Sequence, residues 1–322
     1  MNHNNPNSIP DIETIHQVTL RIDPFIHRTP VLTCKSLDQM IHAELFFKCE
    51  NFQKVGAFKF RGATNAVLSL SDEEANRGVA THSSGNHAQA LALAAKIRGI
   101  KAYIVMPKNS SAVKIKAVEG YGGNIILCEP TLQAREDTLD RVVKETDATF
   151  IHPYNDYRII AGQATCAQEL LEEVKNLDLV IAPVGGGGLL SGTALAVNYL
   201  SPETIVVAAE PEGADDAYRS FTENRLIPQT NPQTIADGLR TSLGDKTYPI
   251  IRKYVNRIVT VSEDAIVSSM RIIWERMKII IEPSAAVPFA ALLENKIDIA
   301  GKRVGIILSG GNVDLDKLPW TK

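Results

Sequence analysis

The segment VIAPVGGGGLL, residues 180–190, is a short apolar run followed by four consecutive glycines and then by more apolar residues. This order predicts a buried strand, a tight turn and a helix. Glycines let backbone N–H groups converge on an anion, and the N-terminus of the next helix adds the positive end of its dipole. One or two glycines would suffice for a plain connection, so we interpret the segment as a phosphate-binding turn.

A dinucleotide site is the main alternative for this turn. Glu210 ends the next predicted strand about 20 residues later, where an acid that binds a ribose would lie. The pattern G-x-G-x-x-G fails, however, because Leu190 and Ser191 occupy the positions that need the last glycine. A single phosphate group therefore fits the turn better than a pyrophosphate.

Strand-like and helix-like segments alternate along the chain, which is typical of an α/β fold with parallel sheets. Ligands of such folds bind at the carboxyl ends of the strands, so we expect the site between two domains. We expect a small α/β domain over residues 72–150 and a discontinuous large domain made of 1–71 and 151–322. The predicted strands are 78–82, 101–106, 124–128, 177–184, 204–210 and 303–308, and the predicted helices are 86–97, 112–121, 132–146, 162–174, 188–200 and 264–277.

The composition of the 322 residues is that of an ordinary globular protein, with 44% hydrophobic residues. The 34 basic and 37 acidic residues nearly balance and form no runs, so neither nucleic acid nor a membrane surface is an expected partner. No apolar run approaches the roughly 18 residues of a membrane span, and the first ten residues lack the basic-then-apolar layout of a signal peptide. Four scattered cysteines, Cys34, Cys49, Cys128 and Cys166, indicate neither a disulfide framework nor a metal site. We expect a cytoplasmic protein with a small-molecule partner.

A lysine lies between two phenylalanines in the segment GAFKFRG, residues 56–62. Lysine is rarely buried without a reason, and loss of solvent lowers its pKa, which makes the amine of Lys59 a nucleophile. The alternative is a lysine whose stem lies across aromatic rings while its amine stays in water. The phosphate-binding turn elsewhere in the chain favours the nucleophile.

Three further segments carry polar groups at the ends of predicted strands. THSSGNH, residues 81–87, offers hydroxyl and N–H groups at a helix start, which suits a carboxylate, although one serine could simply cap the helix. LSGGN, residues 308–312, is alone typical of a loop. The acids of EPEGADD, residues 210–216, could bind Mg²⁺ or Ca²⁺ or form a solvated loop. No HExxH, GxSxG or Walker pattern occurs, which excludes those hydrolase and nucleotidase classes.

Together these motifs resemble the fold-type II pyridoxal-phosphate (PLP) enzymes, which have the two-lobed architecture of tryptophan synthase β. Within them the chain is most similar to the serine racemases, the serine/threonine dehydratases and the threo-3-hydroxyaspartate dehydratases. The resemblance covers about residues 15–314, and the lysine motif, SSGNHAQA, GGGGL, EPEGADD and SGGN occur in the same order. It implies an enzyme with a small amino acid as substrate, and a homodimer.

The resemblance implies a PLP site built around Lys59, which would bind the cofactor covalently. Asn86 would meet the ring hydroxyl, and Ser309 would face the pyridine nitrogen. A neutral hydroxyl there limits protonation of the ring, so racemisation and β-elimination are expected rather than transamination. The remaining cofactor contacts would be Phe58 and Gly238 beside the ring, and Gly185, Gly186, Gly187, Gly188 and Leu189 at the phosphate.

The resemblance also assigns the substrate site and the second proton-transfer group. Racemase-like members have a serine at position 84, where simple threonine dehydratases have alanine. Lys59 on one face of the α-carbon and Ser84 on the other would permit racemisation, and loss of the β-hydroxyl group would give a 2-oxo acid and ammonia. The expected substrate-binding residues are Ser83, Ser84, Gly85, Asn86, His87, Arg135 and Ser242.

The resulting functional hypothesis is a serine racemase that is also an L-serine/L-threonine ammonia-lyase, giving D-serine, pyruvate and ammonia. The alternatives are a threo-3-hydroxyaspartate ammonia-lyase or a catabolic threonine dehydratase. The segment VGAFKFRG, residues 55–62, closely resembles the corresponding segment of the threo-3-hydroxyaspartate dehydratases, so hydroxyaspartate stays an alternative substrate. A non-catalytic regulator that binds a phosphate metabolite is the alternative of a different class.

Two accessory sites follow from the same resemblance. Glu210, Asp216 and the backbone carbonyl of Ala214 would bind a structural divalent cation, Mg²⁺, Mn²⁺ or Ca²⁺. ATP activates animal members, and strong control by ATP is not expected here. The residues that fit the nucleotide site are Gln89, Tyr121, Lys278 and Asn312, whereas Cys34, Lys35 and Val55 replace its small hydroxyl residues.

Overall fold

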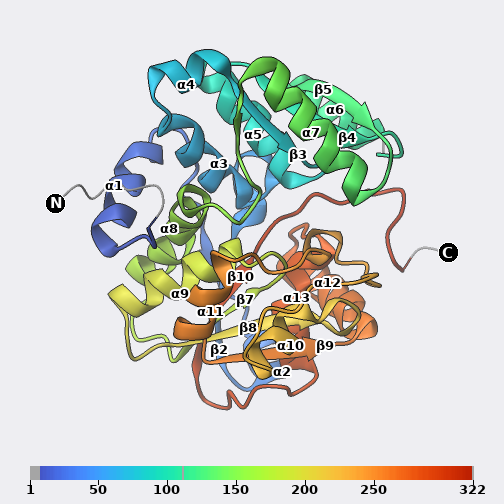
Figure 1. The fold of residues 1–322 in the computed structure, drawn as a ribbon. Coiled ribbons are helices and arrows are strands. Elements are labelled where there is room, and N and C mark those ends of the chain that lie inside the picture. The colour runs from blue at the N-terminus through green and yellow to red at the C-terminus, as the bar shows by residue number, and fades with distance from the viewer. Residues whose placement is uncertain (1–7, 111, 321–322) are drawn as a thin grey trace.

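The computed structural model describes residues 8–110 and 112–320 and contains two sheets (Figure 1). The larger sheet has the order β1-β2-β10-β7-β8-β9 and is parallel except for β1, which pairs antiparallel with β2. Its strands are β1 Val31–Leu32, β2 Glu44–Cys49, β7 Leu179–Pro183, β8 Ile205–Pro211, β9 Arg257–Val261 and β10 Arg303–Leu308.

The smaller sheet has the order β5-β4-β3-β6, and all of its strand pairs are parallel. Figure 1 shows it in the upper part of the molecule, with the larger sheet below. Its strands are β3 Val79–His82, β4 Ala102–Pro107, β5 Asn124–Cys128 and β6 Thr149–Phe150. The predicted fold class, α/β with parallel sheets, is therefore confirmed.

The six strands predicted from the sequence all form, with ends that shift by at most two residues. Five of the six predicted helices also form where expected, namely α5 Asn86–Arg98, α6 Ala112–Gly120, α7 Leu132–Thr146, α9 Gly188–Leu200 and α12 Glu263–Met277. The helix predicted over 162–174 was placed too late, because α8 spans Tyr157–Glu173. Asp156 caps that helix by accepting a hydrogen bond from the Arg158 backbone N–H at 2.8 Å.

Several elements were not assigned from the sequence. They include four strands, β1, β2, β6 and β9, and one of the unassigned helices carries Lys59 as its first residue. The helices are α1 Ile12–Ile22, α2 Lys35–Ile41, α3 Lys59–Leu68, α4 Asp72–Arg77, α10 Asp216–Thr222, α11 Thr247–Tyr254 and α13 Pro283–Leu293, with 3₁₀ turns η1 Glu50–Phe52, η2 Lys54–Gly56, η3 Glu212–Ala214 and η4 Asp237–Leu239.

Both faces of the larger sheet are covered by helices. Along β7, Val180 packs in a cluster with Leu170 of α8, whereas Ile181 packs in a different cluster with Met270 of α12 and Phe289 of α13. Successive side chains of a strand point to opposite faces, so this division shows helices on each side. A continuous apolar strand is what a sheet buried on both faces requires.

The smaller sheet has its own core, and helix α3 packs into it. Phe60 and Val67 of α3 belong to one buried cluster with Ile104 of β4. The strands of this sheet lie within residues 79–150, as a small domain over 72–150 requires. Helix α3 precedes residue 72, so we keep the two-domain division as a proposal in which α3 joins the domains.

A buried ion network fixes the beginning of α3. Arg61 donates to Glu50 at 2.7 Å and to Glu169 at 2.6 Å, and the Lys48 amine donates to Glu169 at 2.6 Å. These four side chains are almost completely buried, so each charge needs the partners that it has. Because Arg61 is two residues after Lys59, the network anchors the helix turn that carries that lysine.

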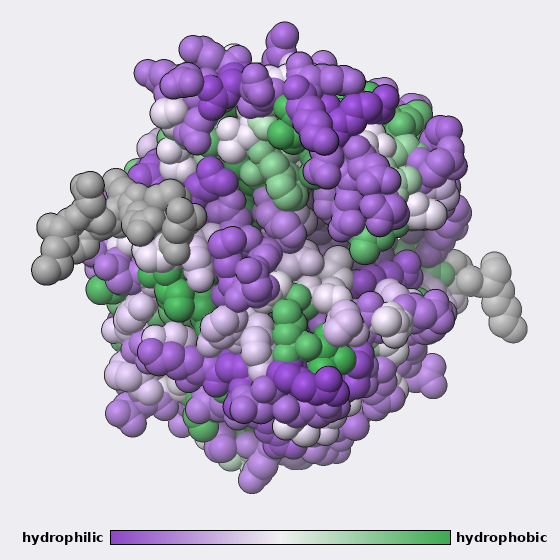
Figure 2. Space-filling model, viewed as in Figure 1, coloured by the Kyte–Doolittle hydropathy of each residue, from purple (hydrophilic) through white to green (hydrophobic). Residues whose placement is uncertain are grey.

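The surface carries no extensive apolar region on the face shown in Figure 2, where hydrophilic side chains predominate and apolar ones form small separate groups. Among the described residues, no helix has both the length and the apolar character that spanning a bilayer requires.

Candidate active site

Lys59 opens helix α3 and points its amine at a backbone carbonyl. Its Nζ donates a hydrogen bond to the Pro153 oxygen at 2.7 Å and lies 5.1 Å from the centre of the Phe58 ring. Burial lowers the pKa of Lys59 to about 8, and the nearby Glu282 carboxylate opposes that shift. The lowered pKa gives the amine a larger neutral, nucleophilic fraction at neutral pH than an ordinary lysine has.

The loop before Lys59 lies against the C-terminal SGGN segment. The Phe58 N–H donates to the Ser309 carbonyl at 3.0 Å, and the Gly311 N–H donates to the Gly56 carbonyl at 2.9 Å. Ala57 and Gly310 form an antiparallel bridge between them. Two segments that are far apart in the chain thus bring Ser309 close to the loop that carries the lysine.

The glycine turn between β7 and α9 is shaped for close approach. Gly187 has a φ of +87°, which favours glycine. A Cβ at Gly186 would lie 2.4 Å from the Tyr154 ring, and one at Gly185 would lie 2.8 Å from the Leu239 Cα. Gly187 supplies no side-chain cap to α9, so the first N–H groups of that buried helix start suit a phosphate.

Gly238 lies beside the same turn, in the 3₁₀ turn η4. A Cβ on Gly185 would lie 3.2 Å from the Gly238 carbonyl oxygen. The Gly238 N–H donates to the Ser284 hydroxyl at 3.1 Å, which fixes this turn to α13. The structure therefore brings Gly238 to the phosphate turn, whereas Leu189 is buried in the apolar cluster beneath it.

Asn86 begins helix α5 and forms hydrogen bonds with the carboxylate of Glu282, the residue directly before helix α13. Its Nδ2 lies 3.0 and 3.1 Å from the two oxygens of Glu282, and its Oδ1 accepts a hydrogen bond from Asn312 Nδ2 at 2.9 Å. Burial raises the pKa of Glu282 to about 7, and the Asp237 charge adds to the rise. The sequence analysis missed Glu282. Its signal was an acid directly before Pro283, which starts a helix.

The turn of residues 83–87 joins β3 to α5 and leaves a helix start open. The Ser83 hydroxyl accepts a hydrogen bond from the Gly85 N–H at 3.3 Å, and Gly85 provides no side-chain cap to α5. Ser84 is half-buried. The His87 ring is buried, with its Nε2 3.2 Å from the Ile151 carbonyl and its Nδ1 without a hydrogen-bond partner among the described residues.

Arg135 lies on α7 near the carboxyl end of β3, where its charge helps burial to lower the pKa of His82. Arg135 Nε and His82 Nδ1 are buried and have no hydrogen-bond partner among the described residues. Such groups are available to a ligand. The Ser242 hydroxyl instead accepts a hydrogen bond from the Gln229 N–H at 2.8 Å, so its contact with substrate stays a prediction.

The comparisons with known proteins decide the class of this site. The family model for pyridoxal-phosphate-dependent enzymes matches residues 22–310. The chain belongs to that family. It is an enzyme of the fold-type II architecture, and PLP is its cofactor, so the alternative of a non-catalytic regulator is not supported. The phosphate turn with its uncapped helix start and the buried Lys59 amine fit the phosphate and the aldehyde of PLP.

Relatives of this PLP enzyme are racemases and dehydratases of small amino acids. The chain is 54% identical to the β-hydroxyaspartate dehydratase of Paracoccus denitrificans, over 97% of this chain and 99% of that protein. It is 49% identical to the serine racemase of Dictyostelium discoideum, over 97% and 96%. The structure of maize serine racemase matches with a TM-score of 0.93 at 48% identity, covering 95% of this chain and 94% of that one. This PLP enzyme is therefore a racemase or dehydratase of that group.

The four acids of residues 210–216 differ in their partners: two accept hydrogen bonds from backbone N–H groups, and two lie beside cationic side chains. Glu210 accepts hydrogen bonds from the Ala217 and Tyr218 N–H groups, and Asp216 accepts one from the Leu243 N–H. The other two acids pair with cations, since Asp215 contacts Arg219 at 2.7 Å and Glu212 lies 3.8 Å from Lys296. No cluster of three or more metal-ligating side chains occurs in the described part of the chain, so a cation here would need backbone oxygens.

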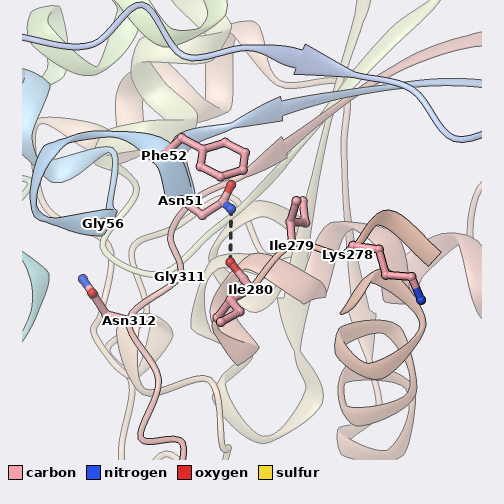
Figure 3. Close-up of a pocket in the computed structure, with 8 residues that line it drawn as sticks. All are labelled: Asn51, Phe52, Gly56, Lys278, Ile279, Ile280, Gly311 and Asn312. Atoms are coloured by element: carbon pink, nitrogen blue, oxygen red, sulfur yellow. Dashed lines mark hydrogen bonds between the residues drawn. The ribbon is translucent and has the colours of Figure 1, made fainter. Parts of the chain in front are cut away.

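A surface cavity of about 400 Å³ lies beside the SGGN segment (Figure 3). It contains two of the four residues that fit a nucleotide site, Lys278 and Asn312. Gln89 is buried, and Tyr121 packs against the core of the smaller sheet. The absence of strong ATP control stays a prediction. The cavity is lined by Asn51, Phe52, Gly56, Lys278, Ile279, Ile280, Gly311 and Asn312.

Proposed function

We propose that this PLP enzyme racemises serine and also removes the β-hydroxyl group of L-serine and L-threonine, giving D-serine and a 2-oxo acid with ammonia. What supports the proposal is a pair of candidate proton-transfer groups, Lys59 and Ser84, since the Lys59 charge acts on His87, three residues after Ser84. Lys59 provides a buried amine with a lowered pKa, and Ser84 provides a hydroxyl in an open helix-start turn. A dehydratase acting on one enantiomer needs only the first group.

Each residue of the site then has a defined task. The N–H groups at the start of α5 bind the substrate carboxylate, because they carry the positive end of the helix dipole and lack a side-chain cap. PLP, when bound, supplies the electron sink that acidifies the α-proton. The Lys59 amine takes that proton on one face of the α-carbon, and the Ser84 hydroxyl donates or takes it on the other.

A second candidate function is the dehydration of threo-3-hydroxyaspartate. Arg135 and His82 leave buried nitrogen atoms without partners near the carboxyl end of β3, and these could meet a second carboxylate. The relative that is 54% identical is named as a β-hydroxyaspartate dehydratase, which supports the same candidate. A catabolic threonine dehydratase is less favoured, since Ser84 replaces the alanine expected there.

A substrate panel separates these candidates. We expect the PLP-loaded enzyme to convert L-serine into both D-serine and pyruvate, whereas a hydroxyaspartate dehydratase would form oxaloacetate from threo-3-hydroxyaspartate and little D-serine. The L- and D-enantiomers of serine and threonine and the hydroxyaspartate isomers are assayed for 2-oxo acid and for the opposite enantiomer. Formation of 2-oxo acid without any D-serine would contradict the racemase.

We also propose a structural divalent cation at Glu210, Asp216 and the Ala214 carbonyl. Burial raises the pKa of Asp216 to about 7 and that of Glu210 well above its ordinary value, and the Asp216 charge adds to the rise at Glu210. Asp216 Oδ1 is buried without a hydrogen-bond partner in the described structure. A hard cation such as Mg²⁺, Mn²⁺ or Ca²⁺ would satisfy that oxygen and neutralise the pair.

Removal of the cation by a chelator is expected to lower the melting temperature, and added Mg²⁺, Mn²⁺ or Ca²⁺ should restore it, because a ligand that binds only the folded state stabilises it. Asp216→Ala should abolish this response. Asp215→Ala is the matched control, since Asp215 pairs with Arg219 and should leave the response intact. Equal responses of both variants and the wild type would show that residues 210–216 form only an acidic loop.

The homodimer and the cytoplasmic location stay predictions from the sequence. Oligomeric state is measured by light scattering of the PLP-loaded enzyme.

A further inference from the structure

The turn between β6 and α8 is closed by a histidine ring. His152 Nδ1 accepts hydrogen bonds from two backbone N–H groups, that of Asn155 at 2.9 Å and that of Tyr154 at 3.3 Å. Both partners are donors, so Nδ1 carries no proton and the neutral ring holds its proton on Nε2. Burial, with the charges of His82 and Lys59, lowers the pKa of His152 to about 4. The acceptor is therefore available throughout the neutral pH range.

The carbonyl inside this turn is the one that receives the lysine. Pro153 lies between His152 and the two N–H groups that the ring binds, and its oxygen accepts the hydrogen bond from Lys59 Nζ at 2.7 Å. Proline has no N–H and a fixed φ, so the direction of its carbonyl depends on how the neighbouring peptides are held. His152 holds both of the peptides that follow.

The far end of the turn is tied to the loop before α11. Asn155 Oδ1 accepts a hydrogen bond from the Lys246 N–H at 2.9 Å, and its Nδ2 donates to Asp245 at 2.6 Å. A Cβ on Gly244 would lie 2.2 Å from Asn155, which shows how closely the two loops fit. The turn thus has one fixed end, and the His152 ring fixes the rest.

Aromatic contacts keep the His152 ring in place. Its centre is 5.6 Å from that of Phe150, and it meets Tyr154 edge-on at 4.5 Å. Tyr154 in turn lies against Gly186 of the phosphate turn. Tyr154 therefore links the His152 ring to the phosphate turn, although nothing in the sequence motifs singled His152 out.

We propose that His152 is a positioning residue for Lys59, because its Nδ1 closes the turn that presents the Pro153 carbonyl to the lysine amine. The inference rests on the proposed function, in which the amine takes the substrate α-proton. A hydrogen bond from one N–H of the amine to Pro153 restricts the directions of the nitrogen lone pair. Without the turn, the amine would sample orientations that do not reach the α-carbon.

Three substitutions of His152 distinguish the effect of its hydrogen-bond acceptor from the effect of its aromatic ring. His152→Phe keeps the aromatic contacts and removes the acceptor. His152→Asn and His152→Leu both remove the ring and have similar size, but only asparagine can accept from the N–H groups two and three residues on. Phe150→Leu is the control, since it alters the contact with the ring and leaves the two hydrogen bonds in place.

The measurement is exchange of the serine α-proton with solvent deuterium, with PLP occupancy from visible absorbance and the melting temperature determined first. At matched occupancy we expect His152→Phe and His152→Leu to slow exchange by about 10- to 100-fold, as displacement of a catalytic group by about 1 Å does. KM for L-serine should change little. His152→Asn and Phe150→Leu should stay close to the wild-type rate.

Two outcomes would overturn the inference. One is wild-type exchange in His152→Phe at full occupancy. The other is equal slowing in His152→Asn and His152→Leu, which would assign the effect to the ring and not to its acceptor. If His152→Phe binds PLP poorly, the asparagine and leucine pair decides alone. Failure of the proposed function itself looks different, because the wild-type enzyme would then exchange no α-proton.

Discussion

Replacing Lys59 by alanine is expected to abolish turnover of every substrate and to remove the visible absorbance of the lysine-bound cofactor. Burial lowers the pKa of the Lys59 amine to about 8, which suits the two tasks proposed for it, the covalent anchor for PLP and the base on one face of the substrate. Loss of a group with both tasks leaves neither the anchor nor the base in place. Absorbance spectra and 2-oxo acid formation are measured on enzyme purified with added PLP.

The control for this variant is Lys101→Ala, which removes an exposed lysine directly before strand β4 of the smaller sheet. It should keep the absorbance and both activities. A lysine-linked cofactor that persists in Lys59→Ala would refute the assignment, and sequencing of the borohydride-reduced peptide would show which lysine carries it.

Replacing Ser84 by alanine is expected to separate the two activities. Loss of a positioned proton donor costs about 10²- to 10⁴-fold, so racemisation and elimination from D-serine should nearly vanish. Elimination from L-serine needs only the base on the Lys59 face and should largely survive. Both rates are measured in the variant and in the wild type at equal PLP occupancy.

Ser83→Ala provides the comparison for Ser84→Ala. The Ser83 hydroxyl accepts a hydrogen bond from Gly85 within the same turn, so its loss should weaken carboxylate binding and lower both activities alike. Equal loss of both activities in Ser84→Ala, or unchanged racemisation, would show that Ser84 is not the second proton-transfer group.

The sequence predicted the strands of the fold better than its helices. Buried parallel strands such as β7 and β10 are short apolar runs that need no knowledge of their neighbours. Helix α3 was missed because it starts at Phe58 and Lys59 without a side-chain cap and contains a glycine and a buried arginine. Arg61 is tolerated there only because Glu50 and Glu169, from distant segments, surround it.

In the candidate site, too, residues in local motifs could be predicted, whereas residues that depend on distant contacts could not. The four motifs around Lys59, Ser84, the glycine turn and Ser309 could be found because each needs unusual residues at fixed spacing. The structure places Phe58 beside Ser309 and Asn86 beside Asn312, as one site requires. Glu282 and His152 could not be found in this way, because their roles arise from contacts between segments that are far apart or from the geometry of one turn.

Incubation of the PLP-loaded wild-type enzyme with L-serine in D₂O tests the central claim most directly. Proton NMR follows the α-proton, and chiral chromatography separates the products. The account predicts that the α-proton signal falls while pyruvate and α-deuterated D-serine appear together. If serine, threonine and 3-hydroxyaspartate all keep their α-protons, the site does not perform the proposed chemistry.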